Sequence, residues 1–406
     1  MDSLFRLPVW ARVLNEFGRR IGYEAGLEEK ELLATARQRT GLWDFGEDYF
    51  REPLRILLRA WQTEAGLTPI GRWLVRQEAL LRLSNRLKIQ DTLRRHPEIL
   101  SCPLREPLVI TGMPRTGTTL LHNLLSQDPQ ARPLLFWEGR RPAPPPTPET
   151  YRRDPRVARS KWELRVGTAM IPEVLKAHWA ESDGPAECNG LFQNGFASPL
   201  FGVMASIPSY GEWLRACDPL PVYREYRRQL QLLSWKFPGR RWVLKAPAHM
   251  FCLESLRTAL PEARLVFNHR DPLEVLPSLC SLVTRLRVLQ GERIDLQELV
   301  DQTLEGAAVA AERFLAFREG ADPGCCYDVH YPGLLADPVA TVHSLCNHFG
   351  LAFSPEVERG ARRWLAENPQ HKHGLHRYSA EQFGLAGRRL DERLEAYRAW
   401  LIRAKK

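Results

Sequence analysis

The sequence lacks the features that mark a secreted, membrane-spanning or metal-rich protein. None of its eight cysteines belongs to a Cys-x-x-Cys pair, so a zinc ribbon or a thioredoxin-like redox site is not expected. No stretch approaches the roughly 20 consecutive apolar residues of a spanning helix. The first residues include an early aspartate and no apolar run, unlike a secretory signal. We therefore expect a cytoplasmic protein, with peripheral membrane contact left open.

Runs of like charge, internal repeats and nucleic-acid-binding motifs are also missing. The formal net charge of +9 comes from 57 Lys and Arg against 48 Asp and Glu, scattered along 406 residues. Such an excess suits an anionic ligand, a nucleic acid or an acidic membrane surface. Because no helix-turn-helix, zinc-finger or aromatic-rich strand motif is present, we do not expect a nucleic-acid partner. A nucleotide-sized anion explains the charge equally well.

The chain divides into a helical region, residues 1–100, and an α/β domain, residues 101–406. Apolar residues recur at helical spacing through the first region. Its first helix is amphipathic and carries three arginines, Arg12, Arg19 and Arg20. We expect the apolar face of this helix to pack against the rest of the protein, although docking on a membrane surface would use the same pattern.

From residue 107 onward, short apolar runs alternate with helical segments. The runs predict buried strands at 108–110, 241–244, 264–267 and 326–329. Helices are expected at 118–126, 250–259, 273–286, 296–317, 339–349 and 391–401. Buried strands that alternate with helices indicate a parallel sheet covered on both sides. The proline-rich stretch at 142–148 is expected to be a stiff connector.

The most informative local pattern joins the first strand to the helix that follows. Residues 112–119 are Gly-Met-Pro-Arg-Thr-Gly-Thr-Thr. Backbone N–H groups in such a turn, together with the start of the helix, bind anions. Gly112, Gly117 and Thr119 have the spacing of a nucleoside triphosphate loop, but Thr118 replaces its lysine. We therefore predict a P-loop-like three-layer α/β fold whose loop holds a smaller anion than a triphosphate.

A second anion-binding pattern lies about 155 residues later. Arg270 directly follows a predicted strand, and Ser278 comes eight residues on, in the next predicted helix. Ligands of open α/β sheets bind at the carboxyl ends of the strands. An arginine fork with a nearby hydroxyl suits a doubly charged phosphate.

Together, these patterns resemble the sulfotransferases that depend on 3′-phosphoadenosine 5′-phosphosulfate (PAPS), especially the bacterial and protein-tyrosine types. The resemblance implies transfer of a sulfuryl group from PAPS to a hydroxyl or amine, with adenosine 3′,5′-bisphosphate as product and no metal required. It implies that Arg270 and Ser278 hold the 3′-phosphate and that Tyr331 lies near the nucleotide. It places the 5′-phosphosulfate on a second group of residues, Arg115, Thr116, Gly117, Thr118, Thr119 and Leu120. Arg115 and Lys245, the latter in Val-Leu-Lys-Ala-Pro, are implied to stabilise the transferring sulfuryl group.

The catalytic base is less clearly indicated. Our first candidate is Glu138, because protein-tyrosine sulfotransferases carry a base glutamate near the corresponding stretch. Burial beside Trp137 would raise the pKa of its carboxyl group toward the working pH. An ion pair with Arg140 or Arg141 is the competing explanation. Three other residues remain candidates: His249, His178 and Glu187.

The acceptor is expected to be a hydrophobic small molecule or lipid, in a pocket built from about residues 160–235 and part of the helical N-terminal region. This segment is rich in aromatic residues that would line a pocket or belong to the core: Trp162, Trp179, Phe192, Phe196, Phe201 and Trp213. The histidine-rich segment 371–376 fits a basic flap or a solvated turn. A P-loop-type nucleotide kinase or NTPase is disfavoured by Thr118, and an anionic-ligand binding protein without activity is the other alternative. The sequence fixes neither the acceptor's identity nor the oligomeric state.

Overall fold

A five-stranded parallel sheet forms the centre of the computed structural model, which describes residues 7–172, 180–237, 240–369, 372 and 378–404. The strand order is β2-β3-β1-β4-β5, with every neighbouring pair parallel. The strands are β1 (Leu108–Gly112), β2 (Ala131–Pro133), β3 (Arg241–Lys245), β4 (Arg264–His269) and β5 (Cys326–His330). Four of the five were predicted. The fifth, β2, was missed because it has only three residues and ends in proline, which is disfavoured within strands.

Both faces of the sheet are buried. Along β1, Leu108 and Ile110 point into one apolar cluster and Val109 into another. The period of two explains why these strands appear in the sequence as continuous apolar runs. One face is covered by α5 (Thr118–Leu125), α16 (Tyr331–Ala336), α17 (Pro338–His348) and α18 (Pro355–Glu367). The other face is covered by α12 (Leu220–Ser234), α13 (Leu253–Ala259), α14 (Pro272–Arg287), α15 (Leu296–Gly320) and α19 (Glu392–Ala404). The predicted three-layer α/β fold is therefore confirmed.

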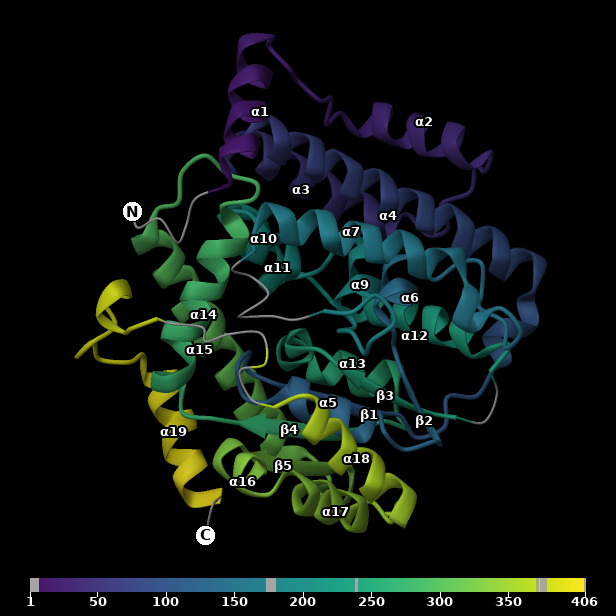
Figure 1. Ribbon diagram of the computed structural model, residues 1–406, viewed down its shortest axis with the longest axis vertical. Coiled ribbons are helices and arrows are strands. Elements are labelled where there is room, and N and C mark those ends of the chain that lie inside the picture. Colours follow the sequence, from purple (N-terminus) through teal and green to yellow (C-terminus); the bar gives the residue numbers. More distant parts are fainter. Residues whose placement is uncertain (1–6, 173–179, 238–239, 370–371, 373–377, 405–406) are drawn as a thin grey trace.

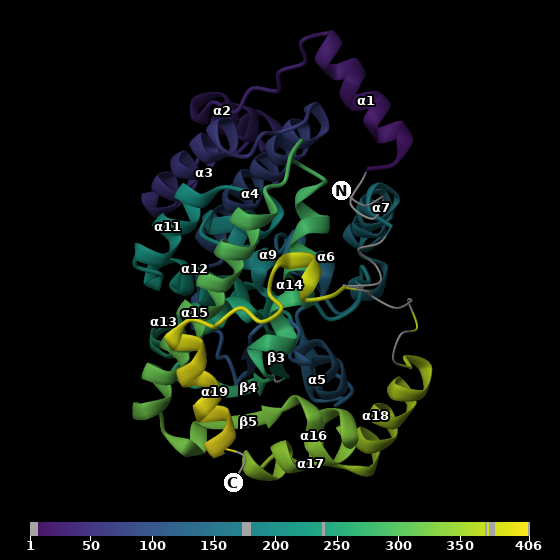
Figure 2. The ribbon, with the colours of Figure 1, turned by 90° about the vertical axis from the view of Figure 1, so that its left-hand side faces the viewer.

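The N-terminal residues form a helical layer at the end of the molecule away from the sheet (Figures 1 and 2). It consists of α1 (Val9–Arg20), α2 (Glu29–Thr40), α3 (Arg51–Thr63) and α4 (Pro69–Arg95), which confirms the predicted helical region. Its apolar core also takes in Phe201 of α10 (Leu200–Met204) and Tyr210 of α11 (Pro208–Ala216). The domain boundary near residue 100 stays a prediction, since this core includes side chains from both sides of it.

Buried polar side chains of α4 bind the helical layer to the segment around α9 (Asn189–Phe192). The fully buried Arg82 donates from NH1 to Gly190 O at 2.8 Å and from NH2 to Gln193 Oε1 at 2.6 Å. Asn85 Nδ2 donates to Asn194 Oδ1 at 2.9 Å. Because buried polar groups are costly to leave unpaired, these contacts fix α4 relative to α9.

The first helix is oriented differently from what its sequence predicted. Its small or polar residues Ala11, Asn15 and Gly18 are buried, while its large apolar side chains are exposed. The expectation that the apolar face packs inward was wrong. Among the described residues, no helix is both long enough and apolar enough to cross a bilayer.

Candidate active site

The loop after β1 has backbone conformations that require glycine at two positions. Gly112 and Gly117 have φ values of +149° and +87°. A Cβ on Gly112 would lie 2.3 Å from the backbone oxygen of Asn268 in β4, and one on Gly117 would lie 3.0 Å from the Tyr331 ring. Gly117 is also the N-cap residue of α5, directly before its first residue, Thr118. The local sequence therefore makes a tight turn with a helix N-terminus facing the sheet edge.

The loop is in direct contact with the second predicted anion-binding pattern. Arg270 NH1 donates to the backbone oxygen of Arg115 at 3.2 Å, and the Arg270 guanidinium lies 4.3 Å from the Tyr331 ring centroid. Arg115 Nε donates to Ser278 Oγ at 3.1 Å. Arg115 has a φ of +69°, which is unfavourable for a side chain with a Cβ. The structure thus brings Gly117, Arg115, Arg270, Ser278 and Tyr331 together at the carboxyl edge of the sheet.

The remaining loop residues lie where the sequence placed them, at the turn and the start of α5. Thr116 Oγ1 donates to the backbone oxygen of Met113 at 2.7 Å and braces the turn. Thr118 is buried, whereas Thr119 is exposed and Leu120 is half-buried at the first turn of the helix.

Asn268, which the sequence analysis did not single out, is part of the same site. Its Nδ2 donates to the backbone oxygen of Thr116 at 3.3 Å. Its Oδ1 is buried without a hydrogen-bond partner among the described residues. The only sequence signal was its position at the end of β4, two residues before Arg270.

Lys245 marks the other end of the site. It ends β3 and is 3% exposed. Its Nζ lies 3.4 Å from Thr119 Oγ1 and 2.7 Å from Glu187 Oε1. Glu187 Oε2 accepts from Asn189 Nδ2 at 2.6 Å, and the backbone N–H of Cys188 donates to the Lys245 oxygen at 2.9 Å. The long connection between β2 and β3 therefore brings Glu187 to Lys245, the buried cation that also contacts Thr119.

Glu138 makes a different set of contacts. It is fully buried in α6 (Phe136–Arg140), and its Oε1 lies 2.9 Å from Arg132 NH2. Its Oε2 accepts from the backbone N–H of Leu135 at 3.0 Å, which caps its own helix. The ion pair that we expected for Glu138, with Arg140 or Arg141, was wrong in its partner. Glu138 pairs with Arg132, whereas Arg140 pairs with Glu78 at 2.8 Å. Among the described contacts, none joins Glu138 to the loop after β1.

Of the two histidine candidates, His249 lies among the described residues. His249 is fully buried, its Nδ1 hydrogen-bonds Tyr223 Oη at 2.9 Å, and its Nε2 has no partner among the described residues. Burial lowers the pKa of His249 to about 3, so the ring is neutral. His178 lies outside the described residues, as does segment 371–376 apart from Lys372. Within the described chain, no cluster of three or more His, Cys, Asp or Glu side chains could hold a metal ion.

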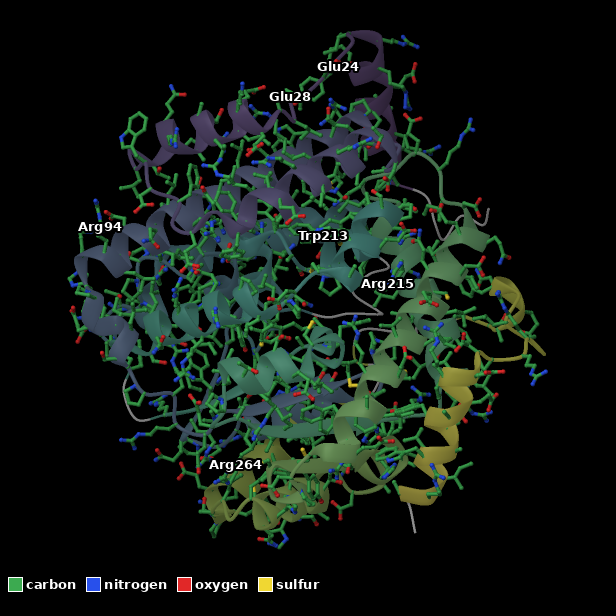
Figure 3. The ribbon with its side chains drawn as sticks, turned by 180° about the vertical axis from the view of Figure 1, so that it is seen from behind. Glu24, Glu28, Arg94, Trp213, Arg215 and Arg264 are labelled. Carbon is green, nitrogen blue, oxygen red and sulfur yellow. The ribbon has the colours of Figure 1, made fainter. Side chains whose placement is uncertain are left out.

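The aromatic residues expected around an acceptor lie in several places. Phe196 and Phe201 belong to the core of the helical layer. Trp213 sits on α11, on the opposite side of the molecule from α5 (Figures 2 and 3). Phe192 packs edge-on against His249, with ring centroids 5.4 Å apart. Trp162 is exposed, and Trp179 lies outside the described residues. Of the five described aromatic residues, Phe192 lies nearest in contacts to Lys245. Its backbone N–H donates to the oxygen of Cys188, whose own N–H donates to the oxygen of Lys245.

Comparisons with known proteins all point to one family. Residues 107–355 match the family described as "Sulfotransferase family". The omega-hydroxy-beta-dihydromenaquinone-9 sulfotransferase Stf3 of Mycobacterium bovis is 27% identical over 299 residues, which cover 72% of this chain and 74% of Stf3. The crystal structure of sulfotransferase STF1 from Mycobacterium tuberculosis superimposes with a TM-score of 0.79 and 33% identity, covering 88% of this chain and 95% of that one. The structure of STF9 from Mycobacterium avium gives a TM-score of 0.85 and 30% identity, covering 94% and 97%.

Proposed function

The chain belongs to the sulfotransferase family, and we propose that it uses PAPS to sulfate a hydroxyl or amine of a hydrophobic acceptor. One observation carries the donor assignment. The hydrogen bond between Arg270 and the backbone of Arg115 brings two anion-binding patterns, far apart in sequence, to one edge of the sheet. A ligand with a phosphate at each end of an adenosine suits such a pair of sites.

The residues present fit this donor. Gly117 has no Cβ between the turn and its neighbours, and the start of α5 presents backbone N–H groups to a 5′-phosphosulfate. Arg270 and Ser278 would hold the 3′-phosphate, with Tyr331 beside the nucleotide. When bound, the donor supplies a sulfuryl group whose bond to the 5′-phosphate breaks as a bond to the acceptor oxygen or nitrogen forms. Thr118, in place of the P-loop lysine, speaks against a nucleotide kinase.

Two cations of this chain would offset the charge that develops during transfer. Lys245 is placed for the sulfuryl end, because it already contacts Thr119. Arg115 contacts Ser278, so under this proposal it would also lie close to the 3′-phosphate. A well-aimed donor of this kind typically contributes ~3 kcal/mol of transition-state stabilisation.

We propose Glu187, in preference to Glu138, as the group that takes the acceptor proton. Glu187 lies next to Lys245, whereas Glu138 uses its carboxylate oxygens for Arg132 and for the cap of α6. A general base has to come within hydrogen-bond reach of the proton that it removes. The contacts of Glu187 support that position better than those of Glu138.

A hydrophobic acceptor, either a small molecule or a lipid, is supported by the relatives. The Stf3 proteins are named for a dihydromenaquinone acceptor. We propose the same chemical class here, acting in the cytoplasm, without nucleic acid as a partner and without a metal requirement.

The donor assignment is tested first by calorimetric titration with adenosine 3′,5′-bisphosphate and, separately, with ATP and magnesium. We expect tight binding of the bisphosphate alone; preference for ATP with magnesium would indicate a nucleotide kinase. The second step is incubation with ³⁵S-labelled PAPS and a lipid extract, with and without a chelator. We expect a labelled lipid-soluble product in both, and retention of all label in the donor would contradict the proposal.

A further inference from the structure

The first helix exposes an unusually large apolar surface. Six large apolar side chains of α1 and its end are 45–66% exposed: Val9, Trp10, Val13, Leu14, Phe17 and Ile21. At 3.6 residues per turn these six side chains share one side of the helix. A contiguous exposed patch of this kind marks an interaction site rather than ordinary surface.

The opposite side of α1 is fixed to the protein through small contacts. Asn15 Oδ1 accepts from the backbone N–H of Ile70 at 2.9 Å. A Cβ on Gly18 would lie 2.6 Å from Pro69, so the helix backbone is in close contact with the start of α4. Arg19 NH1 is 3.0 Å from Glu292. The orientation of the apolar face is thus set by the fold, and the face points away from it.

Basic side chains border the apolar face. Arg12, Arg19 and Arg20 are exposed, against a single acidic side chain within the helix, Glu16. The nearby acidic residues Glu24 and Glu28 belong to the connection between α1 and α2 and not to α1 itself (Figure 3). Arginines beside a face rich in Trp, Phe and Leu are typical of helices that lie in a lipid interface. In a pair of α1 helices from two copies, the same arginines would approach one another and repel.

A second exposed element carries the same chemistry. In α7 (Pro155–Met170), Trp162 is 62% and Val166 38% exposed, with the exposed Lys161 and Arg165 beside them. Both α1 and α7 lie along the right-hand side of the molecule in Figure 2. The connection from β2 to β3 contains α7 and, further on, Glu187, so this side of the molecule is linked to the Lys245 end of the site.

We propose that α1 is an interfacial anchor that docks the enzyme on an anionic lipid surface, with α7 as a second contact. The binding itself rests on the exposed residues of α1. Its purpose, access to a hydrophobic acceptor that resides in the membrane, rests on the proposed function. Bound acidic phospholipid headgroups would face the arginines, while the six apolar side chains enter the boundary with the acyl chains.

The test is cosedimentation of the full chain with vesicles. One set contains phosphatidylcholine alone and the other equal parts of phosphatidylcholine and phosphatidylglycerol. We expect binding to the anionic vesicles, weakened by high salt because screening shortens the reach of the arginines. Phe17→Glu should reduce binding at least tenfold, and Arg12→Gln and Arg20→Gln about fivefold each, the contribution of one basic residue near an anionic surface.

Matched controls keep the result interpretable. Trp43→Glu changes a tryptophan that is 73% exposed and comes three residues after the end of α2. Helix α2 runs away from α1 along the helical layer (Figure 1). Arg94→Gln removes an arginine at the end of α4, on the side away from α1 (Figure 3). Both should bind vesicles as the unsubstituted protein does. Every variant should keep the urea midpoint of the unsubstituted protein, which shows that it is folded and separates this inference from the donor assignment.

Two results would overturn the proposal. One is vesicle binding that Phe17→Glu leaves unchanged. The other is absence of vesicle binding by the unsubstituted protein together with a dimer, measured by sedimentation velocity, that Phe17→Glu dissociates. The latter would identify a second copy of the chain as the occupant of the apolar face.

Discussion

Replacing Arg270 with alanine tests the donor site at the residue that joins its two halves. The Arg270 side chain is 19% exposed, donates from NH1 to the Arg115 backbone and from Nε to Glu274 Oε2 at 2.9 Å. Charge-assisted hydrogen bonds to a phosphate contribute about 1.5–3 kcal/mol. Arg270→Ala should therefore weaken binding of adenosine 3′,5′-bisphosphate by about tenfold to a hundredfold.

Adenosine 5′-monophosphate provides the internal reference, because it lacks the 3′-phosphate. Its binding should fall much less than that of the bisphosphate, because it loses only the support that the Arg270 hydrogen bond gives to the loop backbone. The two dissociation constants are measured by calorimetry at a fixed salt concentration. Equal losses for both nucleotides would refute the assignment, since they would mean that Arg270 only supports the loop.

Glu274→Gln is the matched control for the same measurement. Glu274 is 59% exposed and pairs with the Arg270 guanidinium, for which a bound 3′-phosphate would compete. An exposed ion pair contributes about 0–1 kcal/mol. Removing the carboxylate should leave bisphosphate binding unchanged or strengthen it by up to about fivefold; clear weakening would show that Glu274 itself belongs to the site.

Three further predictions follow from the site and its surroundings. Glu187→Gln should lower kcat by about 10²- to 10⁴-fold with little change in bisphosphate binding. Glu138→Gln should mainly lower the free energy of unfolding, by about 3 kcal/mol, because it weakens the ion pair of the buried Arg132. The reverse pattern in turnover and urea denaturation would restore Glu138 as the base. Gly117→Ala should lower the free energy of unfolding by about 1–2 kcal/mol, because the φ of Gly117 is +87° and the new Cβ would lie 3.0 Å from the Tyr331 ring. The urea midpoint of this variant should drop together with its bisphosphate affinity. An unchanged midpoint would show that the turn adapts to the Cβ without cost. Burial lowers the pKa of His122 and His249 to about 3, so as the pH falls these rings take up protons in the unfolded chain before they do so in the folded one. The stability that is complete above about pH 6.5 should therefore decline as the pH falls toward 3, by up to ~1.4 kcal/mol per pH unit for each ring. Identical urea midpoints at about pH 7.5 and about pH 5.5 would contradict this.

Most of the central sheet could be predicted because its strands are buried on both faces. Strand β1 begins with an uninterrupted apolar run, and two glycines, Gly112 at its end and Gly117 after it, mark positions that leave little room for a Cβ. The spacing from Arg270 to Ser278 was equally informative, since a strand followed by about two helical turns places both at the same edge. These features depend on short stretches of sequence, in which local patterns decide the conformation.

The base could not be chosen from the sequence, because that choice depends on a long connection. About a hundred residues separate β2 from β3, and spacing along such a segment does not say which carboxylate returns to the sheet edge. Glu187 lies beside Lys245 because the backbone N–H of the next residue, Cys188, donates to the backbone oxygen of Lys245. Such a tertiary contact leaves no periodic pattern. Glu138 carried the stronger local signal, yet its carboxylate is held by Arg132.

The orientation of α1 shows a related limit. Periodicity identifies an amphipathic helix, but it does not say which side meets the protein. The useful signal was the row of small residues, Ala11 and Gly18 with Asn15, which permits close approach to α4. Large apolar residues usually mark the buried side, and here they mark the exposed one.

The buried polar side chains of α4 have a consequence for how the chain can be divided. Arg82 and Asn85 satisfy acceptors around Gly190 and Asn194, which belong to the catalytic half by sequence. Expression of residues 101–406 alone would strip those acceptors of their donors and uncover Phe201. The helical portion therefore behaves as an integral part of the catalytic architecture, and a shortened fragment should be recovered as insoluble material. Transplanting this portion between related enzymes would succeed only if its receiving loop moved with it.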